Sequence, residues 1–350
     1  MSLINRPVKN YMFLAGFFLF VALISGCDSQ RATSVLLTGE TMGTSYHITI
    51  ADENSNTSKE RLKKEIDSKL IQVNELFSTY IKSSEVSRFN AYHGVEAQKK
   101  SAEFIKVLAE AQRISDITQG AYDITVGPLV NLWGFGPSFK EEDIPDLQKI
   151  EAALSEVGYK NIVYDKQTNE VRKLKESAYI DFSSIAKGYG VDVLSEFLGS
   201  EGYMNYMVEI GGEMRVKGVN SQGIKWRIAV EKPDSMTRSI YRVISVTDVA
   251  IATSGDYRNF FEKDGVRFSH TIDPTTGQPV QHDLASVTVL SKSSMTADAW
   301  ATAFMVLGDK KGYDLAIRNE LAVLFLVKKG DEIREVSTPM FHKMTEEHSS

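Results

Sequence analysis

Apolar positions recur at helical spacing in several segments of the chain. Residues 58–80 place an apolar side chain every three or four positions, at Leu62, Ile66, Leu70, Val73 and Phe77. This spacing predicts an amphipathic helix with one buried face. The same criteria predict further helices over 101–118, which ends before Gly120, and over 146–157, 186–199, 295–308 and 311–319.

Other segments alternate between apolar and polar residues or form short apolar runs, which is typical of strands. Predicted strands cover 46–51, 161–164, 178–182, 204–208, 213–218, 224–230, 240–246, 249–253 and 285–290. LAVLFLV and EIREVS, joined by Lys329-Gly330-Asp331, predict a hairpin, whereas 121–145 is loop-like. Helices and strands do not alternate strictly, so we predict an α+β fold with mixed or antiparallel sheets and packed helices.

The N-terminus has the features of a secretory signal. Arg6 and Lys9 precede the apolar run 11–26, which is too short for a comfortable membrane span. Small residues before Cys27 resemble a bacterial lipobox, so we expect residues 1–26 to be a lipoprotein signal peptide and Cys27 to carry lipid. The alternative is an uncleaved anchor helix.

The residues after the signal peptide suggest a cellular location. Asp28 resembles the inner-membrane retention signal of Gram-negative lipoproteins, so we expect the protein to be lipid-anchored at the periplasmic face of the inner membrane. The polar stretch 27–40 is predicted to be a tether.

Composition excludes several classes of function. The chain has 350 residues, 42% hydrophobic and 25% charged, which suits a folded protein with a sizeable core. Loss of residues 1–26 lowers the formal net charge from −6 to −8, which argues against a nucleic-acid partner. Cys27 is the only cysteine, so neither a disulfide nor a cysteine nucleophile is available. The sequence has no GxxxxGK[ST], HExxH or GxSxG motif, and no GxGxxG opens a helix.

Candidate chemistry lies in loops and at helix starts. Residues 120–136, GAYDITVGPLVNLWGFG, suit a flat ligand approached closely by backbone, or alternatively a rigid loop that caps the core. Residues 178–192 lead from a predicted strand into a predicted helix through Asp181, Ser183, Ser184 and Lys187. The amides of this helix start can bind phosphate, whereas in a structural reading Ser183 or Ser184 only caps the helix.

His270 and the pair Asp298 and Thr302 each have a catalytic or ligand-binding interpretation and a purely structural one. His270 precedes a Pro-Thr-Thr-Gly turn, and a lone histidine of this kind is more often structural than catalytic. Asp298 and Thr302 lie one turn apart on a predicted helix, so their oxygens point to the same side. They can bind a ligand together, or Asp298 can complement the helix dipole while Thr302 bonds to its own backbone.

Eight segments together closely resemble the FAD:protein FMN transferases of the ApbE family. They are GETMGTSYHI (39–48), FSTYIKSSEVSRFN (77–90), GAYDITVGPLVNLWGFG, IDFSSIAKGYGVD (180–192), VEIGGEMRVKG (208–218), IATSGDYRNFF (251–261), HTIDPTTGQP (270–279) and MTADAWATAFMVLG (295–308). The resemblance implies one ApbE-like domain over 41–345 with an architecture related to the T-fold. It also implies Mg²⁺-dependent transfer of FMN from FAD through a phosphoester to a threonine of a partner protein, with release of AMP.

The resemblance also implies roles for individual residues. The flavin-site positions fall on Met42, Tyr80, Ala121, Tyr122, Asp123, Asp181, Lys187 and Ile272. The metal positions fall on Ser184, through its backbone carbonyl, and on Asp298 and Thr302. Such an oxygen set suits Mg²⁺ and leaves positions for the FAD pyrophosphate. Some relatives carry an acidic residue at 187 and a serine at 301, where this chain has Lys187 and Ala301.

The acceptor threonine needs a base, since a hydroxyl is a poor nucleophile. His270 is the first candidate because imidazole titrates near neutral pH, and Asp298 is the second. The implied acceptors are flavoprotein subunits of membrane electron-transport complexes. Two rival functions remain open: a metal-dependent FAD pyrophosphatase that yields FMN and AMP, and a lipoprotein that binds FAD without chemistry.

Overall fold

The computed structural model describes residues 34–52, 58–136, 144–233, 239–256, 260–263, 266–330 and 332–345. The predicted signal peptide lies outside these residues, as does Cys27. Among the helices of the described ranges, none combines the length and the apolar character needed to cross a membrane.

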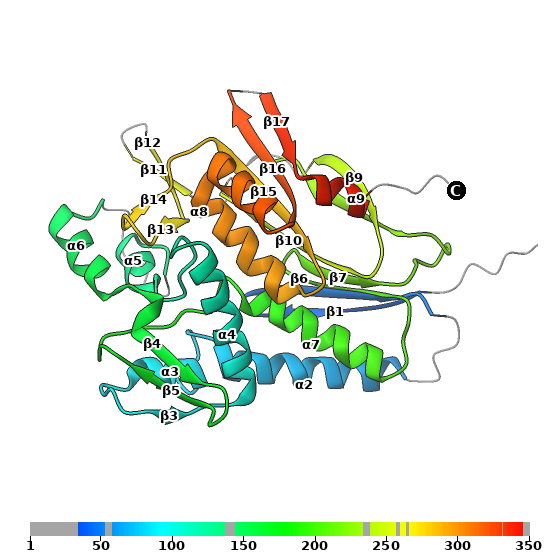
Figure 1. Ribbon diagram of the computed structural model, residues 1–350. Helices are drawn as coiled ribbons and strands as arrows, with labels where there is room; N and C mark the ends of the chain where they lie inside the picture. Colours follow the sequence, from blue (N-terminus) through cyan, green and yellow to red (C-terminus); the bar gives the residue numbers. More distant parts are fainter. Residues whose placement is uncertain are drawn as a thin grey trace, which may run out of the picture.

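An eight-stranded antiparallel sheet forms the centre of the molecule, in the order β1-β2-β6-β7-β10-β15-β16-β17 (Figure 1). Its strands are β1 (Val35–Thr41), β2 (Thr44–Ile50), β6 (Tyr206–Ile210), β7 (Glu213–Lys217), β10 (Val249–Gly255), β15 (Leu284–Ser291), β16 (Ala322–Lys329) and β17 (Glu332–Ser337). The predicted α+β class is confirmed. The predicted tether is too long, because residues 35–40 of it pair with β2 as strand β1.

Shorter strands form small accessory sheets. They are β3 (Gln98–Lys99), β5 (Glu170–Lys173) and β4 (Ile162–Asp165) in one sheet, and the pairs β8 (Trp226–Glu231) with β9 (Ile240–Val246), β11 (Phe260–Lys263) with β12 (Val266–Ser269), and β13 (Ile272–Asp273) with β14 (Gln278–Pro279).

Most helices lie on one face of the central sheet. The helices are α2 (Lys59–Phe77), α3 (Glu85–Ala91), α4 (Ala102–Ile117), α5 (Gly127–Leu132), α6 (Leu147–Glu156), the 3₁₀ turn Tyr159–Asn161, α7 (Ala186–Ser200), α8 (Ser294–Arg318) and α9 (Pro339–Thr345). Helices α2 and α7 pack on β1, β2 and β6, while α4 and α8 cover the part of the sheet near β10 and β15. The β8–β9 pair and α9 pack on the opposite face.

Strand β16 shows why this sheet is buried on both faces. Val323, Phe325 and Val327 enter the core under α4 and α8, whereas Leu324 and Leu326 enter the core under β8, β9 and α9. Successive side chains of a strand point to opposite faces, so an almost continuous apolar run suits a strand covered on both sides.

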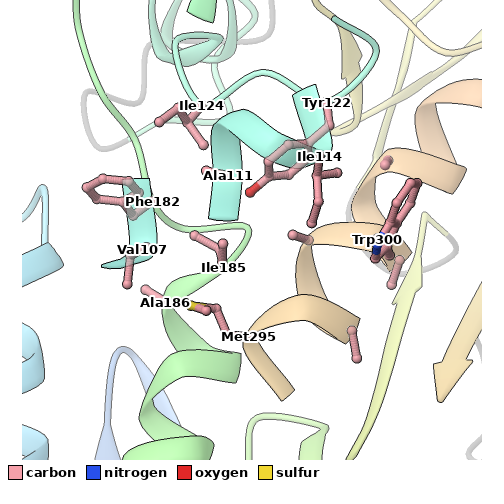
Figure 2. Packing of buried hydrophobic residues seen from close by; sticks show 14 of the residues in the cluster. Val107, Ala111, Ile114, Tyr122, Ile124, Phe182, Ile185, Ala186, Met295 and Trp300 are labelled. Carbon is pink, nitrogen blue, oxygen red and sulfur yellow. The ribbon is translucent and has the colours of Figure 1, made fainter. Parts of the chain in front are cut away.

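The core beneath the site forms where three helices meet (Figure 2). Figure 2 shows Ala111 and Ile114 of α4, Ile185 and Ala186 at the start of α7, and Met295 and Trp300 of α8. The Tyr122 ring lies among these side chains and is 1% exposed. Close packing of this kind leaves the backbone ends of these helices little freedom to shift.

Three sequence predictions need correction or refinement. Residues 178–182 do not form a strand, although Ala178, Ile180 and Phe182 are buried alternately as predicted. The backbone of Ile180 bonds instead to the side chain of Asn90, and the amide of Asp181 donates to the carbonyl of Ile124. The segment is therefore extended and buried without a neighbouring strand.

Three helices, α3, α5 and α9, were not predicted. Helix α5 falls in the segment assigned to a loop, because glycines and aromatic residues mask its one turn and a half of helical spacing. Helix α8 contains a non-helical residue, Gly308 (φ 74°, ψ 175°), so its two parts match the two helices predicted over 295–308 and 311–319.

Candidate active site

A cavity of about 840 Å³ opens where the start of α7, the first half of α8 and several loops converge. The predicted site residues that line it are Tyr80, Ala121, Tyr122, Asp123, Asp181, Ser184, Lys187, His270, Ile272, Asp298 and Thr302. They come from five separate segments of the chain, so the fold alone brings them together. A volume of this size lies within the usual range for small-molecule and cofactor sites.

Met42 is the predicted flavin-site residue that does not line this cavity. It forms a two-residue hairpin turn with Gly43, and both residues have positive φ, 50° and 73°. Such a turn sets the direction of the side chain. Met42 packs against helix α7, where its methyl group lies beside Gly190. The structure therefore places Met42 in the wall behind the cavity.

A buried charged cluster of three residues lies at the inner end of the cavity. The Nζ atom of Lys187 is 3.0 Å from Oε1 of Glu213 and 3.7 Å from Oδ1 of Asp298. Glu213 is 4% exposed and Asp298 is 2% exposed. Two buried carboxyl groups thus meet one ammonium group, whose side chain is 30% exposed.

Burial perturbs both members of the Lys187–Glu213 pair. Burial raises the pKa of Glu213 to about 8, against the lowering effect of Lys187 and with a further rise from Asp298. Burial by itself lowers the pKa of Lys187, but the carboxylates of Asp298 and Glu213 outweigh it and raise this pKa above its ordinary value. Lys187 therefore keeps its positive charge.

The structure corrects the reading of the α7 start. Helix α7 begins at Ala186 with Ile185 as its N-cap, and no side chain caps it, so neither Ser183 nor Ser184 is the N-cap. The amides of Ile185 and Ala186 donate to the carbonyl of Phe182, which leaves them unavailable to a phosphate. The predicted binding of phosphate by the helix-start amides therefore loses two of its donors.

The polar side chains around this turn are held by local bonds. Asp181 accepts hydrogen bonds from the amide of Ser183 at 2.8 Å and from its hydroxyl at 2.5 Å. Ser184 donates its hydroxyl to the phenol oxygen of Tyr122 at 3.0 Å. The carbonyl group is therefore the part of Ser184 that the side-chain bond leaves for a ligand.

Asp123 organises the loop that it belongs to. One carboxylate oxygen accepts from the amide and hydroxyl of Thr125, at 2.7 and 2.6 Å, and the other accepts from the amide of Tyr159 at 2.8 Å. Burial raises the pKa of Asp123. The carboxylate is used by the protein, so Asp123 shapes the cavity wall more than it presents charge to a ligand.

Aromatic side chains form the outer wall. The Nε1 atom of Trp133 donates to the carbonyl of Gly277 at 2.8 Å, and its ring stacks on Phe268 with 5.8 Å between centroids. These contacts join loop 120–136 to the turn that follows His270. Tyr80 lies at the rim and is 72% exposed.

The remaining predicted residues lie between the aromatic wall and the charged cluster. His270 is partly buried, and its ring packs edge-on to Phe135 with 6.3 Å between centroids. Ile272, in β13, is 4% exposed. Thr302 is partly buried one turn after Asp298 on α8.

Sequence reasoning missed two residues at this site. Glu213 and Asp192 received no role, although each is an acidic residue at a buried position of a regular element. An acidic residue among the apolar positions of a strand or helix could have identified them, since acidic side chains are rarely buried without a partner. Trp133 and Phe135 were named only as members of the aromatic loop.

The donor atoms present fit a hard divalent cation. Among the described residues no group of three or more His, Cys, Asp or Glu side chains suits a metal ion, so hydroxyl and carbonyl oxygens would have to complete a site. The carboxylate of Asp298 is 2% exposed, and Oε2 of Glu213 is buried without a hydrogen-bond partner among the described residues. A buried carboxylate beside an unpartnered oxygen is compatible with a bound cation.

Comparisons with known proteins agree with this geometry. The profile of the ApbE family matches residues 42–325. The chain is 46% identical over 319 residues to an FAD:protein FMN transferase of Vibrio cholerae, covering 91% of this chain and 95% of that protein. It is 44% identical over 339 residues to one of Haemophilus influenzae, covering 95% and 98% respectively.

Solved structures give the same result. The flavin transferase ApbE from Vibrio cholerae superposes with a TM-score of 0.84 at 45% identity, covering 89% of this chain and 99% of that one. The apo flavinyl transferase ApbE from Pseudomonas stutzeri gives a TM-score of 0.82 at 37% identity, covering 89% and 97%. The chain therefore belongs to the ApbE family and is a transferase, as its sequence motifs predicted.

Proposed function

We propose that this protein is an FAD:protein FMN transferase that uses Mg²⁺ to attach FMN to a threonine hydroxyl of a partner protein and releases AMP. The relatives named above are called FAD:protein FMN transferases, which supports the transfer of FMN from FAD to a protein. The observation that supports it best is the cavity of about 840 Å³, which has an aromatic outer wall and a charged inner end formed by Lys187, Glu213 and Asp298. A dinucleotide needs both surfaces, one for its rings and one for its diphosphate.

The transfer conserves atoms and charge in a simple way. The threonine oxygen forms a bond to the phosphorus on the FMN side of FAD. The bond from that phosphorus to the bridging oxygen breaks, and AMP leaves with this oxygen. The hydroxyl proton passes to a base on the enzyme. FMN is thereby linked to the acceptor by a phosphoester.

The residues divide this work by their position. Tyr80 would provide aromatic surface for the flavin or adenine rings, whereas the buried Tyr122 supports the cavity wall and accepts the Ser184 hydroxyl. Lys187 stays positively charged and faces the diphosphate. Asp298, Thr302 and the carbonyl of Ser184 would hold Mg²⁺, which neutralises charge that develops on the diphosphate oxygens.

His270 is the first candidate for the base. It lines the cavity, and its ring packs edge-on to Phe135, which also lines it. Asp298 is the second candidate, but a carboxylate that holds Mg²⁺ is a poor proton acceptor. Loss of a general base typically costs about 10²–10⁴-fold in rate.

The cellular setting is also part of the proposal. The sequence features around Cys27 and Asp28 support a lipid anchor at the periplasmic face of the inner membrane. Flavoprotein subunits of membrane electron-transport complexes are then accessible acceptors. Fractionation of cells that express the full chain or its Cys27→Ser variant tests this, and release of the variant from the membrane fraction is the expected result.

The activity is tested with purified mature protein, FAD, Mg²⁺ and such a subunit as acceptor, beside an acceptor whose target threonine is alanine. We expect flavin fluorescence on the denatured acceptor and none on the alanine variant. Release of free FMN without labelling would instead support a pyrophosphatase, and unchanged FAD would support binding alone. The His270→Gln variant should lose labelling while it still binds FAD.

A further inference from the structure

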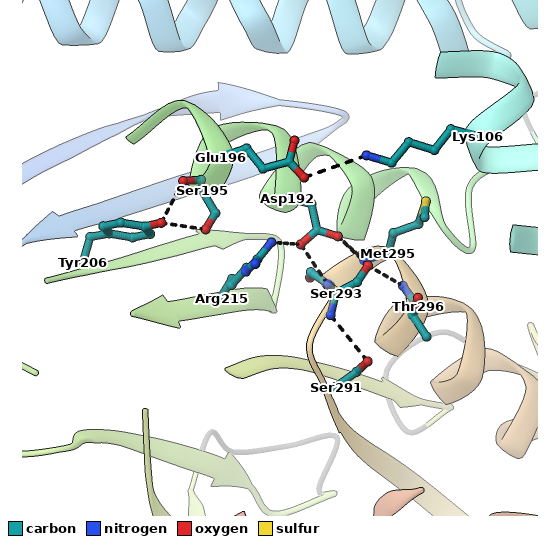
Figure 3. A network of polar contacts seen from close by, with 11 residues as sticks. Lys106, Asp192, Ser195, Glu196, Tyr206, Arg215, Ser291, Ser293, Met295 and Thr296 are labelled. Atoms are coloured by element: carbon teal, nitrogen blue, oxygen red, sulfur yellow. Dashed lines mark hydrogen bonds and ion pairs between the residues drawn. The ribbon is translucent and has the colours of Figure 1, made fainter. Parts of the chain in front are cut away.

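The carboxylate of Asp192, on α7, is saturated by contacts that reach two other elements (Figure 3). It is 5% exposed. Its Oδ1 accepts from Nη1 of Arg215 at 2.8 Å and from the amide of Ser294 at 3.0 Å. Its Oδ2 accepts from the hydroxyl of Ser293 at 2.7 Å and from the amide of Met295 at 3.0 Å. Three of these four donors belong to the first turn of α8.

Helix α8 does not need Asp192 to begin. Ser293 is its own N-cap, and the Ser293 hydroxyl accepts from the amide of Thr296 at 3.2 Å. A local cap of this kind already satisfies one free amide of the first turn. What Asp192 adds is a fixed position of this turn relative to α7.

A second contact between the same helices lies one turn away. The amide of Gly188 donates to Oδ2 of Asp298 at 3.0 Å. The spacing from Gly188 to Asp192 equals the spacing from Ser294 to Asp298, four residues in each helix, so each pair lies on one helix face. A Cβ atom at Gly188 would lie 2.8 Å from Cα of Met295, which shows how closely the two backbones approach.

Strand β7 fixes the register of α7 in turn. Glu213 and Arg215 are two residues apart and therefore point to the same face of the strand. Glu213 pairs with Lys187 at 3.0 Å, and Arg215 pairs with Asp192 at 2.8 Å. The order of charges is acid then base on β7, and base then acid on α7. A displacement of α7 that exchanged partners would bring like charges together.

We propose that Asp192 is a positioning residue that holds the first turn of α8 against α7 and thereby sets the place of the Asp298 carboxylate. The proposal rests on the proposed function, since it assigns Asp192 a role in building the divalent-cation site at Asp298. Groups that orient a metal ligand without touching the metal typically change affinity or activity by about 10–100-fold when they are removed.

The test compares Asp192→Asn and Asp192→Glu with a control that removes another contact of the same helix. The control is Tyr206→Phe, which removes a β6 hydroxyl that donates to the carbonyl of Ser195 on α7 at 2.7 Å (Figure 3). Within the described residues this hydroxyl bonds only to Ser195. For each protein, the Mg²⁺ concentration that gives half-maximal transfer, kcat, binding of Mn²⁺ by electron paramagnetic resonance, and Tm are measured.

We expect Asp192→Asn to bind Mn²⁺ about 10–100-fold more weakly and to need more Mg²⁺ by a similar factor. Asp192→Glu keeps the charge but places it one methylene further out, so it should recover Tm without recovering cation affinity. Tyr206→Phe should have a lower Tm than the wild type but the same affinity for Mn²⁺. If Asp192→Glu is folded and binds Mn²⁺ as the wild type does, the positioning role is wrong and Asp192 only stabilises the fold.

The experiment also separates this proposal from the function on which it rests. Asp298→Asn serves as the reference for a lost ligand. If Asp298→Asn bound Mn²⁺ as tightly as the wild type, the metal assignment of the proposed function would be wrong, and the positioning role with it. If the Asp192 variants bound Mn²⁺ as tightly as the wild type while Asp298→Asn did not, the positioning role would be wrong and the proposed function would be unaffected.

Discussion

The two walls of the cavity are built in different ways. The inner wall comes from α7, α8 and β7, and its side chains Lys187, Glu213 and Asp298 are fixed by buried polar contacts between regular elements. The outer wall comes from loop 120–136 and the turn after His270, which are joined by Trp133 and stacked rings. Tyr80, at its rim, is mostly exposed.

This difference separates chemistry from recognition. Charge that must stabilise a transition state is useful only if it is already in place, and helices and strands supply that order. Aromatic surface that binds rings tolerates small displacements, and loops supply it with room for a ligand to enter. We therefore expect changes in the inner wall to affect kcat and changes in the outer wall to affect KM.

The largest expected effect comes from the inner wall. Asp298→Asn removes the charge that would hold Mg²⁺ but keeps the shape of the side chain, so we expect transfer at saturating FAD and Mg²⁺ to fall by about 100-fold or more. The rate of acceptor labelling measures this. Asp309→Asn is the matched control, because Asp309 lies on α8 beyond Gly308 and pairs with Arg334. Equal loss in both variants would contradict a special role for Asp298.

A glycine pair tests the closeness of the inner wall. Gly188→Ala adds a Cβ atom 2.8 Å from Cα of Met295, so we expect α8 to be displaced, stability to fall by about 1–3 kcal/mol and kcat to fall. Gly199→Ala is the control on the same helix, where the added Cβ atom would lie 3.7 Å from Oη of Tyr206, an ordinary contact distance. Alanine favours a helix, so this variant should be as stable as the wild type or more so. Urea unfolding and transfer kinetics distinguish the two.

The outer wall is tested at its rim. Tyr80→Ala removes an aromatic ring without disturbing the core, so we expect the KM for FAD to rise by about tenfold, with kcat and Tm almost unchanged. Tyr80→Phe retains the ring and should behave as the wild type. Steady-state kinetics with varied FAD measure the effect. A fall in kcat at unchanged KM would show that the two walls do not divide the work as we describe.

The smallest expected effect is a change in how stability depends on pH. The pKa of Glu213 is raised from 4.5 to about 8, so its contribution to stability is present below pH 4.5 and is lost as the pH rises towards 8. The raised pKa of Lys187 has its effect only at alkaline pH, above 10.5. In Glu213→Gln this loss of stability between pH 5 and pH 8 should disappear. We therefore expect the Tm of the variant minus the Tm of the wild type to be larger at pH 8 than at pH 5, by at least about 2 °C. Thermal unfolding in EDTA measures this, and parallel curves would contradict it.

Periodicity predicted most of the regular elements, because an apolar face needs a partner wherever it lies. It found α2, α4, α7 and both parts of α8, and most strands of the central sheet. It failed at 178–182, where burial alternates as in a strand but Asn90 supplies the hydrogen bonds. It also assigned β1 to a tether, because the first strand of an edge hairpin has few apolar residues and a long polar stretch before it.

The site was predicted mostly from the family resemblance, and the structure brings all of its predicted residues except Met42 to one cavity. Sequence alone could not show that Asp192 of α7 meets the start of α8, or that Glu213 of β7 meets Lys187 of α7, since these contacts join positions far apart in the chain. It also could not show that the carboxylate of Asp123 is used within its own loop. Such roles depend on which groups a polar side chain contacts in the folded protein, and the spacing of residues along the sequence does not give these contacts.

The non-helical residue Gly308 divides α8 into two parts that need not share one axis. The carbonyl of Met305, near the end of the first part, accepts from Nε2 of His282 at 2.7 Å, and the ring of His282 lies against Gly308. The part of the helix after Gly308 packs through Gly312 on Phe325 of β16, in the central sheet. The break therefore allows this part to follow the direction that the sheet requires, while the first part keeps the direction that brings Asp298 and Thr302 to the cavity.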